Sequence, residues 1–173
     1  MSFVNVEIKA RCSSPELIRR VLGERKAIFR GIDRQIDTYF NVSQGRLKLR
    51  EGDIEHSLVH YDREDEAGPR KSIVTLYRTV ANSALKEVLT NSLRVLVVVE
   101  KRREIYFIDN IKFHIDTVEQ LGTFVEIEAI DSDGTIGQEA LKRQCEEFMK
   151  LFGIRSEELI HNSYSDMILR AAT

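Results

Sequence analysis

Hydrophobic and polar residues alternate along most of the chain, and this pattern predicts β-strands because side chains two positions apart share one face of a strand. The run at residues 123–130 shows the pattern well, since Glu126 and Glu128 share one face and the residues beside them are apolar. The other expected strands lie at about residues 3–12, 27–40, 46–50, 55–63, 71–80, 94–103, 104–109 and 111–118. Turn-forming residues at 41–45 and 65–69 separate some of them.

Apolar residues recur at helical spacing in several other segments. The first of these begins with Pro15, which fits the first turn of a helix, and stops at Gly23, a typical C-terminal residue. The expected helices cover residues 15–23, 82–93, 141–152 and 164–168, with a short capped turn at 156–159. Because many antiparallel strands come first and most helices come last, the pattern indicates the α+β class.

Charged side chains recur on the polar faces of five strands. They are Glu7 with Lys9, Lys48 with Arg50, Lys101 with Arg103, Lys112 with His114 and Asp116, and Glu126 with Glu128. One interpretation is a set of ordinary half-solvated sheets. The other is a strongly curled sheet whose charged faces meet in one cavity, where bases bind phosphate oxygens and carboxylates bind a hard cation. The recurrence in five strands favours the shared cavity.

Composition narrows the classes of protein. With 173 residues and 42% hydrophobic content, the chain fits one domain, residues 1–173, with a sizeable core. A formal net charge of −2 gives no general attraction to nucleic acid or to acidic membranes, so neither is an expected partner. No apolar run is long enough to span a membrane, no signal segment is evident, and there are two cysteines. We therefore expect a reduced, cytoplasmic setting.

Several familiar catalytic patterns are missing from the sequence. There is no glycine-rich phosphate-binding loop of the usual kinds, so any phosphate must be bound by side chains. The four histidines and two cysteines do not have the spacing of a zinc site. Nothing in the sequence marks a serine or cysteine nucleophile with its base.

Six segments together resemble one known family. They are residues 5–9, 35–40, 47–51, 101–103, 121–128 and 159–166. In order and spacing they are similar to the CYTH superfamily, the triphosphate tunnel metalloenzymes, and most similar to its class IV adenylate cyclase branch. The resemblance covers nearly the whole chain. It implies an eight-stranded antiparallel β-tunnel with flanking helices, which binds a triphosphate together with Mg²⁺ or Mn²⁺.

The resemblance also implies roles for individual residues. The implied metal ligands are Glu7, Asp116, Glu126 and Glu128. The implied substrate-binding residues are Lys9, Tyr39, Lys48, Arg50, Arg63, Lys101 and Arg103, of which Lys9, Arg63, Lys101 and Arg103 are also the implied catalytic residues. The chain departs from the family pattern at Asn5, where the family has a glutamate. Because asparagine brings no negative charge, this change bears on metal affinity.

Three functions follow from the resemblance. The first is the conversion of ATP to cyclic AMP and pyrophosphate. The second is hydrolysis of an inorganic or organic triphosphate, such as tripolyphosphate or thiamine triphosphate. The third is a non-catalytic module that binds nucleotide or polyphosphate, with a metal site weakened at Asn5. A homodimer is compatible with each of them.

Overall fold

Antiparallel strands close into a barrel in the computed structural model, which describes residues 1–63 and 68–173. The strands are β1 (Ser2–Arg11), β2 (Ile28–Phe40), β3 (Arg46–Glu51), β4 (His56–Arg63), β5 (Arg70–Arg78), β6 (Val95–Ile108), β7 (Ile111–Val118) and β8 (Gly122–Asp131). Around the barrel they follow the order β1-β5-β4-β3-β2-β6-β7-β8, so β8 pairs with β1 and closes it. The predicted eight-stranded tunnel is confirmed.

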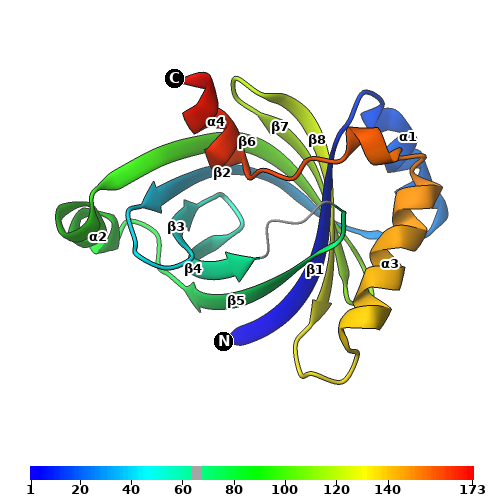
Figure 1. Ribbon diagram of the computed structural model, residues 1–173, viewed down its shortest axis with the longest axis horizontal. Helices are drawn as coiled ribbons and strands as arrows, with labels where there is room; N and C mark the ends of the chain where they lie inside the picture. Colours follow the sequence, from blue (N-terminus) through cyan, green and yellow to red (C-terminus); the bar gives the residue numbers. More distant parts are fainter. Residues whose placement is uncertain (64–67) are drawn as a thin grey trace.

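The helices lie on the outside of this barrel. They are α1 (Pro15–Glu24), α2 (Leu85–Leu93), α3 (Gln138–Leu151) and α4 (Tyr164–Ala171), with a short 3₁₀ turn at Ser156–Glu158. Figure 1 shows α1 and α3 together on one side, next to β1 and β8, and α2 on the opposite side. Strands that form a barrel and helices that flank it confirm the α+β class.

One strand prediction is wrong. Residues 94–103 and 104–109 were expected to form two strands, and they form the single strand β6. Pairing with β7 continues without a break from Lys101 opposite Val118 to Ile108 opposite Ile111, because no turn-forming residue interrupts the alternation. The turn expected at 65–69 falls mainly on residues 64–67, which lie outside the described residues. The single domain over residues 1–173 stays a prediction.

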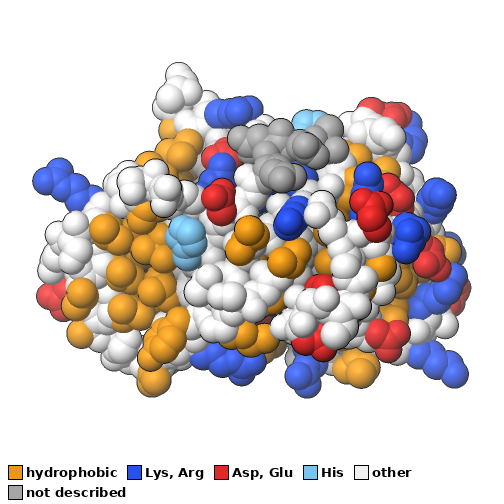
Figure 2. Space-filling model, turned by 60° about the horizontal axis from the view of Figure 1, so that its bottom comes forward, with side chains coloured by type: hydrophobic (Ala, Val, Ile, Leu, Met, Phe, Trp, Pro, Cys, Tyr) orange, Lys and Arg blue, Asp and Glu red, His pale blue; other side chains and the backbone are white. Residues whose placement is uncertain are grey.

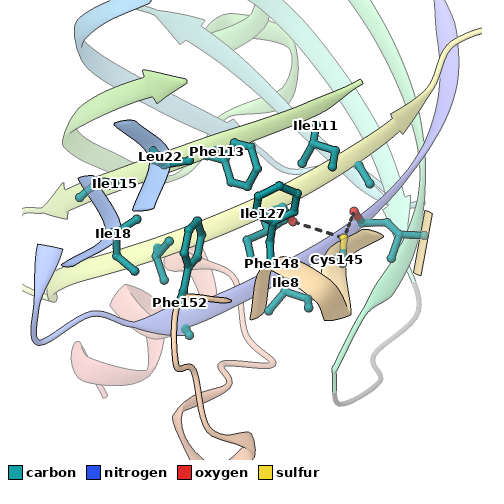
Figure 3. Packing of buried hydrophobic residues seen from close by; sticks show 14 of the residues in the cluster. Ile8, Ile18, Leu22, Ile111, Phe113, Ile115, Ile127, Cys145, Phe148 and Phe152 are labelled. Carbon is teal, nitrogen blue, oxygen red and sulfur yellow. Dashed lines mark hydrogen bonds between the residues drawn. The ribbon is translucent and has the colours of Figure 1, made fainter. Parts of the chain in front are cut away.

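The main hydrophobic core lies between the barrel wall and the helices α1 and α3, outside the barrel (Figure 3). Phe113 of β7 is fully buried there and contacts the ring of Phe148 of α3 at a centroid distance of 4.7 Å. The thiol of Cys145 donates to the backbone oxygen of Val6 at 3.2 Å. Since the apolar faces of β1, β7 and β8 are buried in this core, their charged faces point into the barrel.

The opposite side of the molecule is less well covered. None of the residues of α2 is buried, and Tyr77, Val80 and Val88 in this region are exposed hydrophobic residues. Figure 2 shows hydrophobic side chains gathered on the side where α2 lies. Within residues 1–63 and 68–173, every helix is too short or too polar to cross a membrane.

Candidate functional site

The inside of the barrel is a cavity of about 570 Å³, lined by side chains from all eight strands. The structure brings nearly all of the predicted site residues to its wall: Glu7, Lys9, Tyr39, Lys48, Arg50, Arg63, Lys101, Arg103, Glu126 and Glu128. Asp116 is the exception, because it is fully buried by its partners Arg103 and Tyr164 and does not line the cavity. We call the part of the cavity with these charged residues the ionic section.

Asp37 of β2 organises one side of the ionic section. Arg50 binds it through two nitrogens at 2.9 and 2.8 Å, Lys101 at 2.7 Å and Lys48 at 3.3 Å. Burial opposes ionisation of Asp37, but these cations hold its pKa well below the usual range. Burial, together with Arg50 and Arg103, lowers the pKa of Lys101 to about 7. Three cations around one carboxylate leave positive charge for an anion.

Glu126 organises the other side. Its carboxylate accepts from Arg103 at 3.3 Å and from Nδ1 of His114 at 3.2 Å, and it lies 3.4 Å from the ammonium of Lys9. Burial opposes ionisation, and Lys9 and Arg103 nevertheless lower the pKa of Glu126. Burial and the nearby Arg103 lower the pKa of His114 to about 4, so this imidazole is neutral at pH 7.

Asp116 is fully buried and paired. Arg103 binds both of its oxygens, at 2.7 and 2.6 Å, and the hydroxyl of Tyr164 donates to it at 2.8 Å. The register explains the contact, since Arg103 and Asp116 are directly opposite in β6 and β7. With these donors in place, Asp116 fixes the guanidinium of Arg103 towards the cavity.

Two carboxylates lie directly opposite each other on neighbouring strands. Glu7 and Glu128 are directly opposite in β1 and β8, an arrangement that is unfavourable for like charges. Burial and the charge of Glu7 raise the pKa of Glu128. The amide of Asn5 donates to Glu128 at 2.5 Å, and its own Oδ1 is buried with no partner in the described part of the chain.

These oxygens fit a hard divalent cation in part. Glu7, Glu126 and Glu128 supply carboxylates from adjacent strands, and Asn5 supplies a neutral oxygen. Within the described residues, however, no three acidic, histidine or cysteine side chains are close enough to bind a metal alone. Mg²⁺ commonly takes one or two protein carboxylates and completes its shell with phosphate oxygens and water. The donor set therefore suits a metal that arrives with a phosphate ligand.

Arg63 also indicates an anion. Its side chain is 6% exposed, and its carboxylate neighbours are Glu7 at 3.3 Å and Asp166 at 3.8 Å. Its Nε and one terminal nitrogen are buried with no hydrogen-bond partner in residues 1–63 and 68–173. Buried donors are normally satisfied, so these nitrogens predict a ligand with acceptor oxygens.

The C-terminal segment covers one end of the ionic section. The ring of Tyr164, the first residue of α4, lies 3.8 Å from the ammonium of Lys9. The backbone N–H of Ile160 donates to the backbone oxygen of Lys9, and Asp166 pairs with Arg46 at 2.8 Å. These contacts tie the segment to β1 and β3, so the cavity is closed here by aromatic and charged groups.

The other end of the cavity contains most of its apolar side chains. They are Phe3, Val74, Leu76, Ile105, Phe107 and Ile130, which we call the apolar mouth. Cations also line this end, since Arg30 and Lys112 lie 5.9 and 5.8 Å from the ring of Phe107. Phe3 lies opposite Val74 in the β1–β5 register. Ile105 and Phe107 continue the inward face of β6 beyond Arg103, because alternate residues of a strand share one side. The cavity thus joins a charged half to a half that contains most of its apolar side chains.

The sequence analysis assigned no binding or catalytic role to several lining residues. They are Asp37, Glu55, Lys112, His114 and Tyr164. The in-phase run of Lys112, His114 and Asp116 was a usable signal for β7. Asp37 is also in phase with Tyr39, a residue that the sequence analysis did predict to bind substrate. Glu55 was expected at the start of the strand at 55–63, but it lies in the loop before β4, which begins at His56.

Comparisons with known proteins agree with this geometry. Residues 4–164 match the sequence model of the CYTH domain. The solved PH1012 protein of Pyrococcus horikoshii OT3 is 25% identical, with a TM-score of 0.76 over 94% of this chain and 98% of that one. No curated protein matches the chain.

Two more distant structures share the fold. A candidate adenylate cyclase of Vibrio parahaemolyticus is 19% identical, with a TM-score of 0.68 over 95% of this chain and 97% of that one. A candidate adenylyl cyclase of Hippeastrum, reported to have a dominant triphosphatase activity, is 14% identical, with a TM-score of 0.63 over 99% and 96%.

Proposed function

The chain belongs to the CYTH domain family, and from this premise we propose that its tunnel performs metal-dependent phosphoryl chemistry on an organic triphosphate. The observation that carries the proposal is the joining of an ionic section to an apolar mouth in one cavity. An inorganic triphosphate would use only the charged half, whereas a nucleoside triphosphate would fill both. The most specific form of the proposal is conversion of ATP to cyclic AMP and pyrophosphate.

Glu7, Glu126 and Glu128 would hold Mg²⁺ or Mn²⁺, with Asn5 as a neutral oxygen donor. When bound, such an ion neutralises phosphate charge and orients phosphate oxygens. We assign Asp116 a positioning role instead of metal ligation, because Arg103 and Tyr164 already occupy its oxygens. The protein would then contribute three carboxylates on neighbouring strands.

The cations would bind the remaining phosphate oxygens. These are Lys9, Lys48, Arg50, Arg63, Lys101 and Arg103. In cyclisation, the ribose 3′-oxygen forms a bond to the α-phosphorus, the bond from that phosphorus to the bridging oxygen breaks, and pyrophosphate leaves. The hydroxyl proton passes to water or to a base in the tunnel. Fixed charges that surround the phosphates supply positioning and charge stabilisation, which is most of what phosphoryl transfer requires.

Hydrolysis is the second candidate, supported by the triphosphatase activity of the Hippeastrum relative. In that reaction a water oxygen attacks the terminal phosphorus and the bond to the bridging oxygen breaks. The same carboxylates and cations would serve both reactions, because the two differ in the attacking oxygen and in the phosphorus attacked.

Product analysis by phosphorus and proton NMR tests the proposal. ATP, tripolyphosphate and thiamine triphosphate are each incubated with Mg²⁺ and with Mn²⁺. Cyclic AMP with pyrophosphate from ATP supports cyclisation, and release of orthophosphate supports hydrolysis. If none of the three substrates is converted with either metal, the proposed catalytic function is wrong.

A further inference from the structure

Two hydrogen-bond acceptors lie where the ionic section meets the apolar mouth. His114 of β7 is opposite Ile105 of the mouth on one side and opposite Glu126 of the ionic section on the other. Glu55, from the loop between β3 and β4, reaches Arg50 in the ionic section and Lys112 near the mouth. Both side chains line the same cavity.

His114 lines the cavity at this boundary. Its side chain is 2% exposed, and its Nδ1 lies 3.2 Å from Glu126. Because the carboxylate is the acceptor in this contact, Nδ1 carries the proton of the neutral ring. Nε2 is buried and has no partner among residues 1–63 and 68–173. A buried acceptor without a donor is unfavourable, so this nitrogen indicates a ligand with an O–H or N–H group.

The loop that carries Glu55 is held in place by the carboxylate of Asp33. The fully buried Asp33 accepts from the backbone N–H groups of Asp53, Ile54 and Glu55 at 2.6, 2.9 and 3.1 Å. A Cβ atom at Gly52 would lie 2.6 Å from Asp33 Oδ1, so a residue without a side chain is needed there. The loop is thus built around Asp33, and this fixes where Glu55 enters the cavity.

A carboxylate at this boundary disfavours phosphate and favours hydroxyl donors. Burial opposes ionisation, but Arg50 and Lys112 lower the pKa of Glu55, so it stays charged. Its oxygens only accept hydrogen bonds, so they suit a hydroxyl group and cannot donate to a phosphate oxygen. A ring system in the mouth and phosphates in the ionic section would leave the connecting group beside Glu55 and His114.

We propose that Glu55 and His114 form a subsite for sugar hydroxyl groups, which selects triphosphates joined to their ring system through a hydroxyl-bearing sugar. This inference rests on the proposed function and names its substrate class. Inorganic tripolyphosphate cannot provide these hydroxyl donors, and a ribonucleoside triphosphate provides two neighbouring ones. Glu55 is bound by Lys112, which is two residues before His114 on the inward face of β7, so one sugar can approach both acceptors.

The test compares ligands with and without the hydroxyl groups. Binding of ATP, 2′,3′-dideoxy-ATP and tripolyphosphate is measured by calorimetry, with Ca²⁺ as the cation to slow turnover. We expect wild type to bind dideoxy-ATP about tenfold or more weakly than ATP, the size of one lost hydrogen bond to a charged group. Equal affinity for ATP and dideoxy-ATP would overturn the subsite.

Two variants test whether Glu55 and His114 are the residues that recognise the hydroxyl groups. In Glu55→Gln and in His114→Phe, the ratio of the affinities for ATP and dideoxy-ATP should shrink to about threefold or less. The matched control is Glu51→Gln, since Glu51 is a carboxylate that pairs with Lys86 on the surface. Glu51→Gln should show the same ratio of affinities for ATP and dideoxy-ATP as wild type. Thermal unfolding verifies that each variant is folded. If a variant does not fold, the comparison of ATP with dideoxy-ATP in wild type still tests the subsite.

The outcomes separate the two proposals. Metal-dependent binding of tripolyphosphate and ATP without discrimination of the hydroxyl groups overturns the subsite and leaves the proposed function intact. The subsite is also overturned if Glu55→Gln and His114→Phe both keep the wild-type ratio of affinities for ATP and dideoxy-ATP. Failure of both ATP and tripolyphosphate to bind overturns the proposed function and the subsite with it.

Discussion

The two faces of the same strands have opposite chemistry. On β8, Val125, Ile127 and Ala129 point outwards into the core formed with α1 and α3, while Glu126 and Glu128 point into the tunnel. In many small barrels the side chains that fill the interior form the core. Here the core lies outside, and the interior is left to charged groups.

This difference assigns stability and function to separate faces. The outer face buries apolar area, which is the main favourable contribution to folding. The inner face contains buried ion pairs, whose attraction is largely offset by the loss of hydration. We therefore expect outer-face substitutions to change stability and most inner-face substitutions to change ligand binding.

The largest expected effect is on the outer face. Phe113→Ala removes a fully buried ring from the core and should lower the free energy of unfolding by about 3–5 kcal/mol. Denaturant unfolding measures the loss. Phe29→Ala is the control, because Phe29 is 52% exposed, and should cost less than about 1 kcal/mol. If the folded Phe113 variant lost its affinity for tripolyphosphate, the two faces would not be separable.

Asp116→Asn should lower the free energy of unfolding although Asp116 lies on the inner face, so it is an exception to the separation of the two faces. Asp116 is paired with Arg103 and is fully buried, so its neutralisation leaves a buried guanidinium without its partner and should cost about 3 kcal/mol. Glu128→Gln should not destabilise the metal-free protein at pH 7, because the pKa of Glu128 is raised and its ionised form is unfavourable. Equal losses in the two variants would contradict the positioning role of Asp116.

A pH series sharpens the account of the ionic section. Lys101 has a pKa lowered to about 7, so it is partly neutral in the free protein at pH 7 to 8. A bound triphosphate favours the charged ammonium, so binding takes up a proton and weakens as the pH rises above about 7. The affinity should fall by up to about tenfold per pH unit.

Calorimetry in buffers of different ionisation enthalpy counts the protons taken up. In Lys101→Arg the uptake should vanish, since a guanidinium stays charged at these pH values. Proton uptake that is the same in wild type and in the arginine variant would assign the titration to another group.

The smallest effect concerns Asn5. Asn5→Glu adds a carboxylate beside Glu128 and should tighten metal binding by about tenfold or less. In the metal-free protein the added charge should lower the melting temperature, because neighbouring carboxylates repel each other. Asn5→Gln is the control for size without charge. A metal affinity that is unchanged in Asn5→Glu would place this residue outside the coordination sphere.

Strand periodicity was sufficient to predict which residues face the tunnel. The alternation around Glu126 and Glu128 gave their shared face, and the same rule placed Lys101 and Arg103. It could not predict pairing across the barrel, such as Lys101 with Asp37, because those residues are far apart in the sequence. Register decides such contacts, and register depends on how the whole barrel closes.

Asp116 and Glu55 show two further limits. Asp116 alternates in phase with His114, so its periodicity alone suggested a ligand in the cavity. The residue opposite it in β6 is Arg103, which takes up both of its oxygens. Glu55 owes its position to the backbone contacts of Asp33, and no sequence period records them.

The most direct test of the central claim is metal-dependent turnover of ATP and tripolyphosphate by wild type and by the double variant Glu126→Gln, Glu128→Gln. Both substitutions keep size and remove charge. We expect a folded double variant whose turnover at a given Mg²⁺ or Mn²⁺ concentration falls at least about 100-fold, because the carboxylates that would hold the cation are gone. Wild-type turnover by the double variant at the same metal concentration would contradict the account.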